Sequence, residues 1–166
     1  MRAWEIENIK SFMTKLLKGN SFDLFLLEKA DIFSSMKMHF DGHYYDGYFQ
    51  NDDLSERKKH GNCIPYVEVK HIFFEAIKGD KVPLHFLFVL KASDEVVESI
   101  CTISDVNKED VNGMFLNLSY KEKRLLVTAG ISMKTFTQNK AVEDVWCDKI
   151  ENFLKKSGFT WSYSLK

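Results

Sequence analysis

The residues 114–133, MFLNLSYKEKRLLVTAGISM, decide the fold of this chain. They form two runs of alternating apolar and polar residues on either side of a charged turn, KEKR, at residues 121–124. Side chains alternate along a strand and cross-strand partners share a face, so pairing the two runs gathers their apolar residues on one side. That side holds Met114, Leu116, Leu118, Tyr120, Leu125, Val127, Ala129, Ile131 and Met133. The polar residues of the other face indicate an antiparallel hairpin with one wetter side.

Further strands are expected on both sides of this hairpin. Residues 84–90 are apolar on both faces, which predicts a central place in the sheet. At least one strand is expected within residues 22–32, and a short one over residues 3–6. Phe159, Trp161, Tyr163 and Leu165 alternate with polar residues, which predicts a strand at the end of the chain.

Three long helices and a short one follow from apolar residues at helical spacing. The long helices are expected over about residues 9–18, 64–78 and 140–157, and the short one over residues 94–101. Asn8 can cap the first helix, and a glycine follows each long helix. We expect their apolar stripes to be buried, that of the second helix including Ile72. The residues expected to be buried in particular are Phe12, Leu16, Phe73, Ile77, Trp146 and Phe153.

The order of these elements predicts the fold class. Hairpins dominate, and strands and helices do not alternate strictly as they would in a doubly wound fold. The expected class is therefore α+β, a predominantly antiparallel sheet with about three to four helices packed on it. No linker rich in glycine, proline or serine interrupts residues 1–166, so a single domain is expected.

Composition excludes some classes of partner. The chain has 166 residues, a formal net charge of −1 and three widely spaced cysteines. A balanced charge argues against nucleic-acid binding. No stretch reads as a secretory signal or is apolar over enough residues to span a bilayer, so no membrane partner is expected. Free thiols fit a reducing compartment, and the predicted location is the cytoplasm.

A second hairpin is expected around Asp41-Gly42, a strong two-residue turn signal. In that register Phe40 opposes His43, Met38 opposes Tyr45 and Lys37 opposes Asp46. The polar and aromatic face of this hairpin is the predicted binding surface, because tyrosine and histidine rings suit both water and a protein contact. Its residues are Lys37, His39, Tyr44, Asp46 and Tyr48. The contact would join a protein partner or a second copy of the chain.

The region from His39 to Cys63 also contains metal-ligand residue types. His39, Asp41 and His43 are spaced two apart, with His60 and Cys63 downstream. The hairpin register would point His39 and His43 to opposite faces, where they cannot share one ion. No metal and no cofactor are therefore expected.

Known catalytic motifs are absent from the sequence. It contains no phosphate-binding glycine loop, no G-x-S-x-G, no H-E-x-x-H and no C-x-x-C. The function stays unknown at this point, and the interpretation that fits best is a non-catalytic binding or interaction module that uses a sheet face or groove. The alternative is an unrecognised metal-assisted hydrolase that uses the region from His39 to Cys63, so whether the chain is an enzyme stays open.

Four short blocks carry a resemblance. They are IKSFMTKLL at residues 9–17, ADI at 30–32 with FDG at 40–42, IKGDKVPL at 77–84, and NGMFLN at 112–117. With these blocks the chain resembles a small bacterial family of uncharacterised proteins of similar length. The resemblance implies a bacterial, cytoplasmic setting, and it carries no activity and no catalytic residues over to this chain.

Overall fold

The hairpin of residues 114–133 forms as expected in the computed structural model, which describes residues 1–164. Strand β5 (Val111–Lys121) pairs with β6 (Arg124–Met133), and Leu118 lies opposite Val127. Glu122 and Lys123 form the two-residue turn, with φ of 53° and 62°. Positive φ at both turn residues matches the right-handed twist of the flanking strands. The predicted register and its apolar face are confirmed.

The sheet has seven strands in the order β3-β2-β4-β5-β6-β1-β7, and every neighbouring pair is antiparallel. β4 lies between β2 and β5, which confirms the interior strand expected near residues 84–90. The terminal strand is also confirmed, although Leu165 lies outside the described residues. The remaining strands are β1 (Ala3–Ile6), β2 (Leu26–Phe33), β3 (Lys37–Asp41), β4 (His85–Lys91) and β7 (Trp161–Tyr163).

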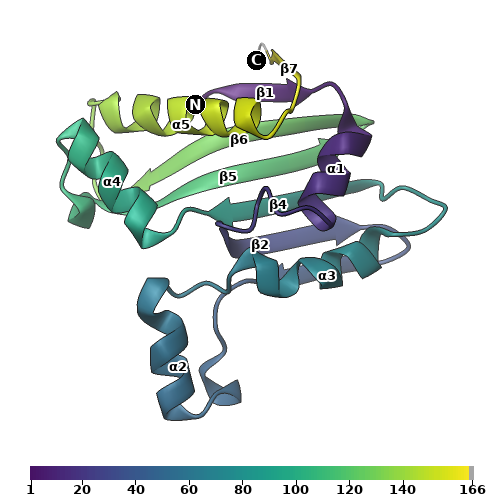
Figure 1. The fold of residues 1–166 in the computed structure, drawn as a ribbon, viewed down its shortest axis with the longest axis horizontal. Coiled ribbons are helices and arrows are strands. Elements are labelled where there is room, and N and C mark those ends of the chain that lie inside the picture. Colours follow the sequence, from purple (N-terminus) through teal and green to yellow (C-terminus); the bar gives the residue numbers. More distant parts are fainter. Residues whose placement is uncertain (165–166) are drawn as a thin grey trace.

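Four helices lie on one side of this sheet (Figure 1). They are α1 (Ile9–Leu17), α3 (Tyr66–Ile77), α4 (Asp94–Ser104) and α5 (Ala141–Lys156). The Asn8 side chain caps α1 by accepting a hydrogen bond from the Ser11 backbone N–H at 3.0 Å. A further helix, α2 (Asn51–Arg57), was not expected and lies away from the sheet. Single 3₁₀ turns cover Asp46–Tyr48, Lys58–His60 and Lys108–Asp110. The α+β class is confirmed.

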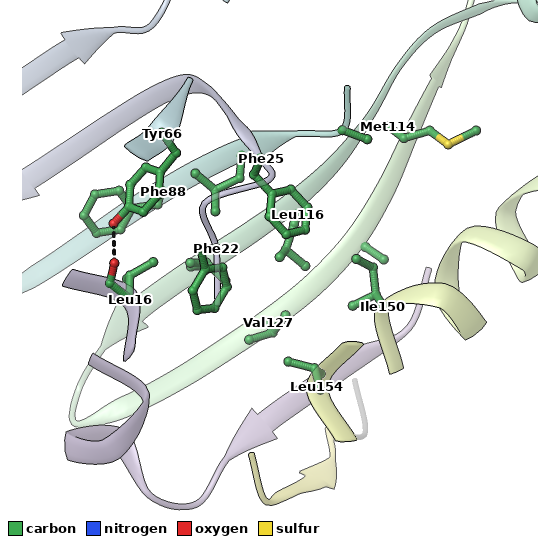
Figure 2. Packing of buried hydrophobic residues seen from close by; sticks show 14 of the residues in the cluster. Leu16, Phe22, Phe25, Tyr66, Phe88, Met114, Leu116, Val127, Ile150 and Leu154 are labelled. Atoms are coloured by element: carbon green, nitrogen blue, oxygen red, sulfur yellow. Dashed lines mark hydrogen bonds between the residues drawn. The ribbon is translucent and has the colours of Figure 1, made fainter. Parts of the chain in front are cut away.

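The hydrophobic core fills the space between the helices and the sheet (Figure 2). Of the residues expected there, Phe12, Leu16, Phe73 and Trp146 are buried, and Ile77 and Phe153 are half-buried. Ile72 is exposed, so its place in the buried stripe of α3 was wrongly expected. Tyr66 takes a core position nearly two turns earlier, where its hydroxyl donates a hydrogen bond to the Leu16 carbonyl at 2.9 Å.

The hairpin expected at Asp41-Gly42 does not form. β3 pairs instead with β2, so that His39 lies opposite Asp31. The chain continues past Gly42, whose N–H donates to the Glu28 carbonyl, and φ of Gly42 is not positive. The glycine serves a close approach, because a Cβ there would lie 1.9 Å from the Leu27 carbonyl oxygen. A turn signal and a close-contact glycine look alike in sequence, which explains the error.

Within the described residues, no helix combines the length and the apolar character that crossing a membrane requires.

Candidate functional site

Residues 45–61, which contain α2, form an arm that extends from the sheet (Figure 1). The two segments that join this arm to the sheet, residues 42–44 and 62–64, form a narrow neck. Residues 42–44 and 62–64 run antiparallel there, with His43 opposite Cys63. The Tyr44 N–H donates to the Asn62 carbonyl at 3.0 Å, and the Ile64 N–H donates to the Gly42 carbonyl at 2.8 Å. The neck therefore holds His43 and Cys63 side by side although the whole arm separates them in sequence.

Strand β2 contributes a third side chain through a β-bulge. Leu27 pairs with Leu90 and Lys29 pairs with the adjacent Val89, which leaves Glu28 as the extra residue. A bulge re-aims the side chain of the extra residue and is common beside active sites. Here it brings the Glu28 carboxylate to the neck of the arm.

Glu28, His43 and Cys63 converge at this point. The Cys63 thiol donates to Glu28 Oε2 at 3.3 Å, and His43 Nε2 lies 3.4 Å from Glu28 Oε1. The ligand atoms of the three residues all lie within 4.8 Å of one another. Cys63 is buried, whereas the His43 side chain is 46% exposed, so the cluster lies at the boundary between core and solvent.

Asp41 orients the imidazole of His43. Its Oδ1 accepts a hydrogen bond from the His43 backbone N–H at 2.9 Å and lies 2.6 Å from His43 Nδ1. These contacts, the backbone one first, hold the pKa of the Asp41 carboxyl below its ordinary value. With Nδ1 held by Asp41, Nε2 is the nitrogen directed at Glu28.

The state of Cys63 distinguishes two kinds of chemistry. Burial, followed by the nearby Glu28 carboxylate, raises the pKa of the Cys63 thiol to about 12, and the charge of Lys91 acts in the opposite direction. The thiol is therefore protonated near neutral pH and is a poor nucleophile. A bound cation has the opposite effect, because it stabilises the thiolate. The cluster suits metal ligation better than a cysteine nucleophile.

The ligand atoms lie close enough together to converge on one ion. Bonds of about 2.0–2.3 Å place the ligands of a tetrahedral ion about 3.3–3.7 Å apart. The Glu28 carboxylate contacts the other two residues through different oxygens, with 3.3 Å from Oε2 to Cys63 Sγ and 3.4 Å from Oε1 to His43 Nε2, and both distances are of this size. A thiol, an imidazole and a carboxylate together favour zinc-class ions over magnesium or calcium.

A family model matches residues 15–162. The chain belongs to this family of unknown function, DUF5721. No curated protein and no solved structure matches the chain. Glu28, Asp41, His43 and Cys63 all lie within the part that the DUF5721 model covers.

The residues predicted as a binding surface do not share a hairpin face. Lys37 and His39 lie on β3, whereas Tyr44, Asp46 and Tyr48 belong to the neck and the arm. His39 lies beside Asp31, with 2.5 Å between His39 Nδ1 and Asp31 Oδ1, and is not part of the Glu28 cluster.

The prediction of no metal depends on the Asp41-Gly42 hairpin, which is replaced in the structure by the pairing of β2 with β3. The His60 side chain lies outside the part of the chain that the structure describes.

Sequence reasoning missed Glu28. The signal that could have found it is the break in alternation across LLEKA at residues 26–30, where two apolar residues precede two charged ones. Such a break is typical of a bulge, because one extra residue shifts the following side chains to the opposite face.

Proposed function

We propose that this chain binds one zinc-class metal ion through Glu28, His43 and Cys63 and uses it for metal-assisted hydrolysis. The observation that supports this most is the convergence of three different ligand types at one point, with Asp41 behind His43. Metal-bound histidines usually donate their second nitrogen to a carboxylate, which fixes the tautomer and the ring orientation. A cluster of acidic residues alone would have neither the three ligand types nor a carboxylate that orients a histidine.

The number of ligands favours a catalytic site over a structural one. Structural zinc sites have four protein ligands, whereas catalytic sites have three and keep one position for water or substrate. Three ligands are present among the described side chains, and the exposure of His43 lets solvent reach them. A zinc-class ion in such a site lowers the pKa of its bound water to about 7, which supplies hydroxide for attack on a carbonyl or phosphoryl group.

Metal binding is measured directly by cobalt absorption. We expect the metal-free protein to take up one equivalent of Co²⁺ with a thiolate-to-cobalt charge-transfer band, and Zn²⁺ to displace it. Cys63→Ala should abolish the band, and His43→Ala and Glu28→Gln should weaken binding. Asp41→Asn should keep the band but lower the affinity by about 10–100-fold, because it removes only the orientation of His43.

Two variants serve as matched controls. His39→Ala removes a histidine that also contacts a carboxylate, and Cys147→Ala removes a buried free thiol elsewhere. Both should bind cobalt like the unmodified protein. The metal proposal is wrong if the unmodified protein shows no thiolate band, or if Cys63→Ala retains it.

The proposed hydrolytic activity is measured separately from metal binding. The zinc-loaded protein should hydrolyse activated esters or phosphoesters, such as p-nitrophenyl acetate and bis(p-nitrophenyl) phosphate, faster than an equal concentration of free zinc. The metal-free protein should be inactive. Tight zinc binding without any such rate increase would leave a metal-binding protein and exclude hydrolysis of these bonds.

Contact through the arm is a second candidate function. Tyr45 and Tyr48 are 78% and 81% exposed, and tyrosine rings can bury apolar area while their hydroxyls stay hydrogen-bonded. The residues of the predicted surface that lie on the neck and the arm, Tyr44, Asp46 and Tyr48, would then join two copies of the chain. Tyr44→Ala with Tyr48→Ala should lower the molar mass measured by sedimentation to that of one chain while the thermal melt stays nearly unchanged. An unmodified protein that sediments as one chain at every concentration would contradict this contact.

We also place the chain in the bacterial cytoplasm. Its three cysteines are free in the structure, which fits a reducing compartment. The bacterial origin rests on the resemblance described above.

A further inference from the structure

A second candidate site lies at the end of β4 remote from the Glu28 cluster. It is a cleft of about 460 Å³ between α1, residues 77–83 and the turn that joins β5 to β6. Phe86 lines this cleft, whereas the β2 bulge lies beside Val89 and Leu90, toward the other end of the strand. The two sites are therefore separate, and ligand binding in this cleft does not require the proposed metal.

The interior of the cleft is apolar. Phe86 and Tyr120 form its inner wall, with their rings stacked at a centroid distance of 5.1 Å and an angle of 16°. Met13 and Ile77 add aliphatic surface, and Val82 at the rim is 71% exposed. A concave apolar surface of this size is typical of a small-molecule site.

The rim of the cleft is basic. Lys10, Lys81 and Lys123 line it, and no acidic residue does. None of the three lysines forms an ion pair with a side chain that the structure describes. The first turn of α1 contains no acidic residue, so the partial positive charge at this helix end adds to that of Lys10. The charges around the cleft are complementary to an anion.

One neutral polar side chain, Tyr120, also lines the cleft. Although Tyr120 as a whole is only 9% exposed, its hydroxyl is not one of the buried unpartnered groups of the described residues and is open to solvent. A hydroxyl that opens onto the cleft can donate a hydrogen bond to a ligand there, which makes it a candidate ligand contact. It adds a neutral donor to the three cations at the rim.

We infer that this cleft binds a small amphipathic carboxylate, such as a free fatty acid of medium chain length. The aliphatic chain lies against Met13, Ile77 and Phe86. The carboxylate accepts hydrogen bonds from the Tyr120 hydroxyl and from the lysines at the rim. Charge and apolar surface are both needed, because lysines alone would bind any anion weakly and the apolar wall alone would not select for charge.

Calorimetric titration of the full chain with decanoate, below its micelle concentration, tests the inference. We expect saturable binding of one equivalent of decanoate, no binding of acetate, and binding of decanol weaker by about tenfold or more, as for the loss of charged hydrogen bonds. Tyr120→Phe should weaken decanoate binding by about three- to tenfold, because it removes one hydrogen bond and keeps the ring.

A charge variant and its matched control complete the test. Replacing Lys10, Lys81 and Lys123 together by glutamine should weaken decanoate binding by about tenfold or more and leave the affinity for decanol unchanged. The same change at three exposed lysines away from the cleft, Lys29, Lys134 and Lys140, should leave both ligands unchanged.

Three results would overturn the inference. Equal affinity for decanoate and decanol would show that the charge plays no part. A charge variant that binds decanoate as tightly as the unmodified protein would exclude the lysine rim. If the chain does not bind decanoate but sediments with phosphatidylglycerol vesicles, it binds a lipid surface and not a free carboxylate.

Discussion

Replacing Phe88 by alanine lowers the free energy of unfolding by about 3–5 kcal/mol, because a buried ring leaves a cavity that closes only in part. Phe88 is 0% exposed, and its ring centroid lies 5.1 Å from that of Phe73 and 5.3 Å from that of Phe86. It is on β4, an interior strand, so both α3 and the sheet lose contacts. Denaturant unfolding measures the change.

The neighbouring residue is the matched control for this prediction. Leu87 faces the other side of the same strand, where it is half-buried. Leu87→Ala should cost about 1–2 kcal/mol, since less apolar area returns to water. A loss below about 1 kcal/mol for Phe88→Ala would contradict the interior position of β4.

Replacing Gly42 by alanine also destabilises the protein strongly, by about 3 kcal/mol or more, because the added methyl group overpacks the backbone. The new Cβ would lie 1.9 Å from the Leu27 carbonyl oxygen and 2.5 Å from its carbonyl carbon. These atoms belong to β2 and cannot move away without breaking the pairing that holds the neck. We therefore expect cobalt binding at the Glu28 cluster to be lost as well.

Gly130→Ala provides the control, because the nearest atom to its added Cβ would be Asn117 Nδ2 at 3.7 Å, an ordinary contact. The free energy of unfolding of this variant should change by no more than about 0.5 kcal/mol, as for surface substitutions. Thermal or denaturant melts of the two variants measure the difference. A Gly42→Ala protein that melts like the unmodified chain would show that the close approach at the neck is wrong.

The parts of the fold that were predictable are those set by local patterns. The β5–β6 hairpin joins adjacent segments through a two-residue turn, so alternation alone specifies its register. Asn8 and the helical spacing after it locate α1 in the same way. These signals depend on neighbours within a few residues.

The burial of helix residues could not be predicted where it depends on a partner far away in the sequence, and a helix without an apolar stripe could not be predicted at all. Ile72 lies on the apolar side of α3 by spacing, yet it is exposed, because the sheet meets the helix along Tyr66 and Phe73. Helix α2, with the sequence NDDLSER, carries one apolar residue and no stripe, so periodicity could not find it.

The candidate site was predictable only in its residue types. The region from His39 to Cys63 contained two of its three ligands, but the assumed turn at Gly42 placed His43 on the wrong strand. Glu28 comes from another element altogether, and its side chain reaches the cluster through a bulge in the pairing of β2 with β4. Neither the bulge nor the neck is a local property of the chain.

The sequence by itself determined the α+β class, the hairpin of residues 114–133, the four helices that pack on the sheet and most of the core, because hydrophobic periodicity and capping act between near neighbours. Only the tertiary structure decided that β3 pairs with β2, that Gly42 lies against Leu27, and that Glu28, His43 and Cys63 meet. The physical reason is that these contacts join segments far apart in the chain. They are selected by the packing of the whole sheet and by the backbone hydrogen bonds that close the neck.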